Sequence, residues 1–92
     1  MDNENRLIGE TERARRATTI IENPLWEESW DQMHDHYLAA LVDAPINDMD
    51  VVKDIKITLR LLEQLRSNFD EIVRTGQLAS IELKELRDGR RS

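Results

Sequence analysis

Apolar residues recur along most of the chain at intervals of three and four, which is the pattern of an amphipathic helix. The first such segment runs from about Arg6 to Glu22, and its apolar row is weak: Leu7, Thr11, Ala14, Thr18 and Ile21. Asn23 and Pro24 follow, and these are a favoured N-cap and a favoured first helical residue. Because proline disfavours helical backbone at the residue before it, we expect one helix to end here and the next to begin at Pro24.

The second helix is predicted over about residues 24–42. Its apolar row consists of Trp26, Trp30, Met33, Tyr37 and Leu41. Pro45 should stop this helix, and either Asn47 or Asp48 can cap a third one. A connection of this length favours two antiparallel helices, so we expect a helical hairpin.

The third helix is predicted from about Met49 to Thr75. It carries a heptad-like seam formed by Val52, Ile55, Leu59, Leu62, Arg66, Phe69 and Val73. A second apolar row beside this seam makes the face wider than one partner helix requires. Gly76 is a plausible helix end, followed by a short helix over residues 77–87. A helix that continues through Gly76 is the alternative, at about 1 kcal/mol.

These elements predict an all-α fold, with a hairpin core between a short N-terminal and a short C-terminal helix. We expect one domain over residues 1–92, with flexible tails at 1–5 and 88–92. A chain of 92 residues buries only about 60–65% of its unfolded surface, so a homo-oligomer is expected. The aromatic row and the seam would then pack in the core or between subunits. Arg66 either specifies the register of the seam or extends its charged end to water.

Composition excludes several classes of site. The chain has no cysteine and three glycines, so thiolate chemistry and glycine-rich phosphate loops are absent. His34 and His36 point about 200° apart on a helix and cannot share one ion. We therefore expect no catalytic residues, no cofactor, no metal and no enzymatic activity. The polar N-terminus predicts no signal peptide, and no apolar run is long enough to span a membrane.

The net charge of −6 is unevenly distributed. Residues 23–54 hold one basic and eight acidic side chains, whereas residues 55–92 hold eight basic and six acidic ones. Glu27, Asp31 and Asp35 form an acidic row, which is either a solvated face or a docking face for a basic partner. This acidity argues against base stacking on the aromatic row, because phosphates would be repelled.

Arginines gather near both ends of the chain. Near the start, Arg13, Arg15 and Arg16 can pair with neighbouring glutamates, or they can contact DNA phosphates. Near the end lie Arg87, Arg90 and Arg91. This second group is less neutralised, so it is either inert or binds nucleic acid or an acidic protein surface.

The order of helices and helix boundaries in the chain resembles that of small helical proteins encoded among the packaging and head genes of tailed bacteriophages and gene transfer agents. The resemblance rests on Glu22-Asn23-Pro24-Leu25, the Asp-containing turn at 43–50, the long aliphatic helix and Thr75-Gly76-Gln77-Leu78-Ala79. It covers roughly residues 14–83. Within that setting the chain is similar to a small terminase subunit.

This resemblance implies a non-catalytic oligomer that acts between viral DNA and the packaging motor in the cytoplasm of an infected bacterial cell. The hairpin would build the oligomer, and the arginines would contact DNA or the large terminase subunit. The 22 residues before Asn23 leave no room for a separate helix-turn-helix domain, so we expect weak sequence specificity. The alternative is a small acidic phage protein that binds and modulates a host or virion protein through residues 24–42.

Overall fold

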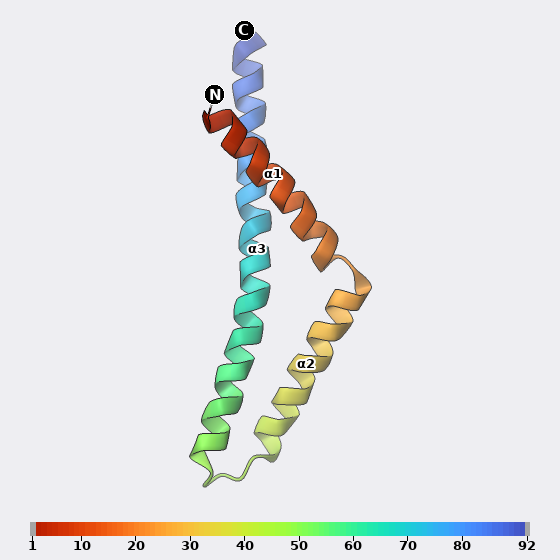
Figure 1. Ribbon diagram of the computed structural model, residues 1–92, viewed down its shortest axis with the longest axis vertical. Helices are drawn as coiled ribbons and strands as arrows, with labels where there is room; N and C mark the ends of the chain where they lie inside the picture. Colours follow the sequence, from red (N-terminus) through yellow and green to blue (C-terminus); the bar gives the residue numbers. More distant parts are fainter. Residues whose placement is uncertain (1, 92) are drawn as a thin grey trace. The chain divides into compact units, whose positions relative to one another are not determined.

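The computed structural model describes residues 2–91, with side chains described for residues 2–89. Three helices follow one another in this part of the chain: α1 (Asp2–Ile21), α2 (Pro24–Asp43) and α3 (Met49–Arg91) (Figure 1). Residues 2–91 contain no strand. The predicted all-α class is confirmed.

The boundary between α1 and α2 lies at the predicted position. Asn23 has extended backbone angles, φ −69° and ψ 124°, and Pro24 opens α2. The Asn23 side-chain oxygen accepts a hydrogen bond from the backbone N–H of Leu25 at 2.9 Å. Asn23 is therefore the N-cap of α2, because its side chain satisfies an amide that the first helical turn leaves unpaired.

The connection between α2 and α3 is also formed by the residues that the sequence indicates. Ala44, just before Pro45, is extended with φ −63° and ψ 138°. Asp48 caps α3, because its side-chain oxygen accepts from the Val51 N–H at 3.3 Å. Of the two predicted caps, Asn47 and Asp48, the structure uses Asp48.

The predicted break at Gly76 is wrong, and so is the separate C-terminal helix over residues 77–87. α3 continues without interruption to Arg91. Gly76 is fully buried, and a Cβ atom placed on it would overlap the Ala14 methyl and lie 2.8 Å from the Glu10 carbonyl oxygen. Gly76 therefore lets the backbones of α1 and α3 approach closely, and it does not end a helix.

Both outer helices extend further than predicted. Residues 2–5 belong to α1, and residues 88–91 belong to α3, so the tails expected at these positions are helical. Asp2 and Glu4 lie in the first turn of α1. Carboxylates are favoured at that end of a helix, which gives a physical reason for the earlier start.

Residues 2–91 divide into two compact units. The first unit joins residues 2–22 to residues 68–91. Its core is a buried cluster of Leu7, Ala79 and Leu83. Ala14 and Ala17 of α1 are also buried. Small side chains thus occupy much of the contact between α1 and residues 68–91, and they allow the two backbones to approach closely at Gly76.

The second unit consists of residues 23–67. Trp30 and Leu62 are its buried apolar residues among the described side chains. The indole N–H of Trp30 donates to the Leu62 carbonyl oxygen at 3.1 Å. The aromatic row was predicted to pack in the core or between subunits: Trp30 is buried within this unit, whereas Met33 of the same row is 49% exposed.

The remaining residues of the predicted rows are partly buried. They are Trp26, Tyr37, Leu41, Val52, Ile55, Leu59, Arg66, Phe69 and Val73. Leu62 alone among the seam residues is fully buried. The expected single domain over residues 1–92 stays a prediction.

Candidate functional site

An aromatic and charged cluster surrounds Trp30 in the second unit. The Trp30 and His34 rings stack with centroids 4.8 Å apart and planes 16° apart. The Arg66 guanidinium lies over the indole, 4.4 Å from the ring centroid. A cation over an indole face is an attractive arrangement. The indole is therefore covered by side chains of the same unit.

Two contacts between α2 and α3 flank this cluster. Arg66 Nη2 lies 3.4 Å from Glu27 Oε1, and His34 Nε2 lies 3.4 Å from Glu63 Oε1. Arg66 lies in the predicted seam, where it was expected to specify the register or to extend its charged end to water. Within this unit Glu27 is its partner, and the Arg66 side chain stays 41% exposed.

The predicted acidic row contains one residue that pairs with α3 and two that are exposed to solvent. Glu27 pairs with Arg66, whereas Asp31 is exposed and the Asp35 side chain is 81% exposed. Over the described residues, no three His, Asp or Glu side chains gather closely enough to hold a metal ion. His34 stacks on Trp30, while His36 packs edge-on against Tyr37.

A basic row on α3 adds to the sites predicted from the sequence. Lys53, Lys56 and Arg60 are exposed and line a shallow groove whose other walls include Met49 and Ile57. Their spacing of three and four residues places them on one helix face. That spacing is the signal in the sequence, but intervening acidic and apolar residues make it less conspicuous than the terminal arginine clusters.

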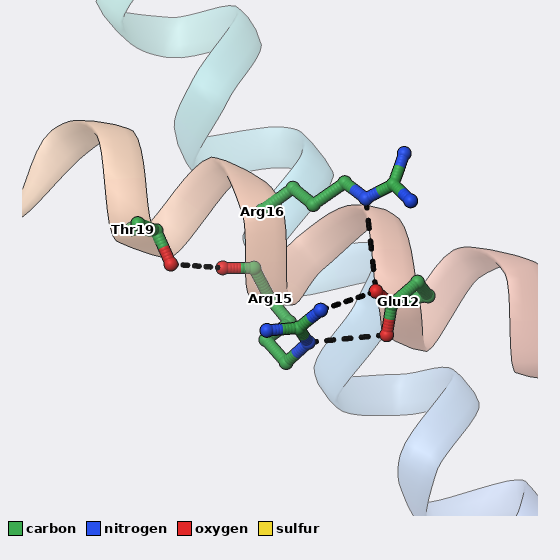
Figure 2. A network of polar contacts seen from close by, with 4 residues as sticks. All are labelled: Glu12, Arg15, Arg16 and Thr19. Carbon is green, nitrogen blue, oxygen red and sulfur yellow. Dashed lines mark hydrogen bonds and ion pairs between the residues drawn. The ribbon is translucent and has the colours of Figure 1, made fainter.

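The predicted N-terminal arginine cluster forms a salt-bridged network on α1 (Figure 2). Arg15 contacts both carboxylate oxygens of Glu12, with its Nε 3.1 Å from Oε2. Arg16 Nε lies 3.6 Å from Glu12 Oε1. The Thr19 hydroxyl donates to the Arg15 carbonyl oxygen at 3.0 Å. Both arginine side chains remain largely exposed, at 69% for Arg15 and 76% for Arg16.

This network shifts the pKa values of Glu12 and Arg15. The hydrogen bond from Arg15 lowers the pKa of the Glu12 carboxyl group, and the charges of Arg15 and Arg16 act in the same direction. The same hydrogen bond raises the pKa of Arg15. Glu12 is therefore ionised over a wider pH range than a free glutamate, and it offsets part of the positive charge of the cluster.

The other predicted contact arginines do not join this network. Arg13 lines a shallow groove with Glu10, Glu71 and Thr75. Arg87 lines a different groove of the same unit. The side chains of Arg90 and Arg91 lie outside the described residues. The structure thus brings Arg15 and Arg16 together on Glu12 and places Arg13 and Arg87 elsewhere.

Comparison with known proteins identifies no relative: no protein-family model, curated protein or solved structure matches this chain. Over the described residues, no helix combines the length and the apolar character that a membrane crossing requires.

Proposed function

We propose that this chain is a non-catalytic oligomeric adaptor of the phage DNA-packaging type, similar to a small terminase subunit. In this proposal α2 and the first half of α3 form an antiparallel helical hairpin that assembles with other copies. The assembly acts between viral DNA and the large terminase subunit, in the cytoplasm of an infected bacterial cell. Catalysis belongs to the partner, and this chain needs no cofactor.

Exposed apolar surface on the second unit carries this proposal. The exposed large side chains there include Met33, Val51, Ile57, Leu61 and Leu65. Leu61 is 64% exposed and lies one helical turn from Leu65, which is 43% exposed. Such side chains gain free energy when a neighbouring subunit removes them from water. This supports self-association of the hairpin.

Exposed arginines of the first unit support the contact with DNA. Arg15 and Arg16 keep most of their side-chain surface in water although both lie beside Glu12. Arg13 is exposed and shares its groove with Glu10 and Glu71. Because acidic groups accompany these cations, we expect weak, salt-sensitive binding without strong sequence preference.

The second candidate function is an acidic interaction protein that modulates a host or virion protein through α2. The exposure of Asp31 and Asp35 favours it. In this alternative a basic surface of another protein covers the acidic row. Such a protein can act as a monomer, which separates it from the first proposal.

Light scattering across a concentration series, combined with gel shifts at low salt, tests the proposal. We expect an oligomer at tens of micromolar and retarded DNA that is released as salt rises. Replacing Arg13, Arg15 and Arg16 by alanine should weaken DNA binding and flatten its salt dependence. A matched triple replacement of Arg6, Arg74 and Lys84 by alanine, all at exposed positions, controls for the loss of three positive charges. A strictly monomeric protein would overturn the proposal.

A further inference from the structure

Two exposed rows lie on the same side of the second unit. The α2 row consists of Asp31, Asp35, Leu38 and Val42, and the α3 row consists of Met49, Lys53, Lys56 and Arg60. Both rows advance by steps of four, three and four residues, so each follows one helix face. Their members are all exposed.

The contact between His34 and Glu63 locates the two rows. His34 lies three residues after Asp31 and four before Leu38, so the α2 row borders it. Glu63 lies three residues after Arg60, so the α3 row borders it in the same way. Because His34 and Glu63 lie 3.4 Å apart, both rows flank this one contact and share one side of the unit.

The rows also match in height along the two helices. Trp30 is opposite Leu62, and each residue of a helix advances about 1.5 Å along the axis. To within about one such step, Asp31 is then level with Arg60 and Asp35 with Lys56. Nearer the connection, Leu38 is level with Lys53 and Val42 with Met49. The two acidic positions are thus level with basic ones, Leu38 is level with the basic Lys53, and the apolar Val42 and Met49 coincide.

Asp35 Oδ1 lies 4.0 Å from His34 Nδ1, and the other matched charges have no ion pair within the described residues. Among the side chains of residues 2–89, none forms an ion pair with Asp31, Lys53, Lys56 or Arg60. Both rows lie beside the α2–α3 contact, so their side chains do not face each other across it. The side of the unit therefore presents the acidic pair Asp31 and Asp35 next to the basic row Lys53, Lys56 and Arg60.

We infer that this side of the unit binds a second copy of the chain through a twofold axis parallel to α2 and α3. A rotation of 180° about that axis places α2 of one copy over α3 of the other at the same height. Asp31 and Asp35 then meet Arg60 and Lys56 of the second copy, and Val42 meets Met49. The result is a four-helix bundle in which each contact occurs twice.

The second copy fits this side better than an unrelated acidic or basic protein does. A purely basic partner would satisfy Asp31 and Asp35 but would oppose Lys56 and Arg60. A purely acidic partner would have the converse effect, since like charges at an interface are repulsive. A copy of the same face supplies both signs in the right order, and its apolar end covers Val42, which is 78% exposed, and Met49, which is 67% exposed.

This inference rests on the self-association in the proposed function, but not on DNA or on a phage partner. Two charge-reversed chains test it by sedimentation velocity, with circular dichroism as the check on folding. One carries Asp31→Lys with Asp35→Lys, and the other carries Lys56→Glu with Arg60→Glu. Each alone opposes like charges at the interface, so we expect its association to weaken by about 100-fold. Mixed in equal amounts, the two should form a heterodimer as stable as the unmodified dimer.

Matched controls alter charge by the same amount elsewhere on α3. Glu82→Lys with Glu85→Lys serves the first chain, and Arg74→Glu with Lys84→Glu serves the second. These residues are all exposed and lie in the other unit. We expect both controls to associate like the unmodified chain.

The outcomes separate this inference from the proposed function. Monomers throughout would overturn both the inference and the proposed oligomer. Oligomers that ignore both reversals but dissociate on Leu61→Gln with Leu65→Gln would overturn the inference and leave the proposed oligomer standing. Recovery of association on mixing, without any DNA binding, would support the inference while removing the DNA part of the proposed function.

Discussion

The indole N–H of Trp30 in α2 donates to the backbone carbonyl of Leu62 in α3 at 3.1 Å. These residues are 32 positions apart in the chain, and both are buried. A single side chain thus supplies apolar packing and a polar contact between two helices. The indole suits this position, because its N–H needs a partner when the ring is buried.

Replacing Trp30 should destabilise the second unit strongly. Trp30→Ala removes the largest buried side chain there, and we expect the free energy of unfolding to fall by about 3–5 kcal/mol. Trp30→Phe keeps much of the apolar volume but loses the hydrogen bond, so a fall of about 1–2 kcal/mol is expected. Urea unfolding measures both. Trp26→Phe, at a half-buried position, is the comparison, and an equal effect there would contradict the role assigned to Trp30.

Adding one methyl group at Gly76 should destabilise the first unit. Gly76→Ala brings a Cβ atom into the Ala14 methyl and the Glu10 carbonyl oxygen. We expect a loss of about 1–3 kcal/mol in thermal or urea unfolding, as for other overpacked sites. Gly9 is helical and exposed, and a Cβ atom there meets nothing within 4 Å. Gly9→Ala should therefore stabilise by about 0.5–1 kcal/mol.

The signs of these two substitutions are opposite although the chemical change is identical. Combining Gly76→Ala with Ala14→Gly relieves the closest overlap and should recover part of the lost stability. If Gly76→Ala alone raised the melting temperature, the close approach of α1 to α3 would be disproved.

Acid should weaken the Glu12 network. The pKa of Glu12 is lower in the folded chain than its ordinary value of 4.5, chiefly because of the Arg15 hydrogen bond. Its contribution to stability is therefore fully present above pH 4.5 and is lost as the pH falls through the lower folded pKa. NMR titration of the Glu12 carboxyl carbon measures this. In an Arg15→Gln chain the titration midpoint should rise, and an unchanged midpoint would refute the assigned cause.

Arg66 should stabilise the second unit both through the aliphatic part of its side chain and through its positive charge. Arg66→Met keeps an aliphatic cover but removes the cation over Trp30 and the pair with Glu27, so a loss of about 0.5–1 kcal/mol is expected. Arg66→Ala should lose more, because it also uncovers the indole face. Arg74→Met, at an exposed position, is the control for helix propensity. Salt should reduce the difference in stability between the unmodified chain and the Arg66→Met chain, and a salt-independent difference would argue against the ion pair.

The features that could be predicted from the sequence are those determined by residues close together in the chain. Asn23 and Pro24 define a helix boundary by their own backbone and side-chain chemistry, and Pro45 and Asp48 do the same at the next connection. The burial of Trp30 follows from its place in a helical row. Each of these interpretations needs only residues within a few positions of one another.

Features that depend on distant residues were not predictable in this way. Gly76 is read as a helix end when it is considered alone, and its role becomes visible only with Ala14 beside it. The exposure of Met33 and the pairing of Arg66 with Glu27 depend on the register of α2 on α3. That register is set by side-chain packing between segments far apart in the sequence, which periodicity alone does not specify.

The close approach at Gly76 also makes α3 sensitive to its neighbour. Glycine weakens a helix by about 1 kcal/mol relative to alanine, so α3 carries its intrinsic weak point at the position that α1 covers. When α1 is docked, packing compensates for that weakness, and when α1 is released the backbone amides around residue 76 lose their protection first. Hydrogen exchange at these amides would therefore act as a built-in reporter of whether the first helix is in place.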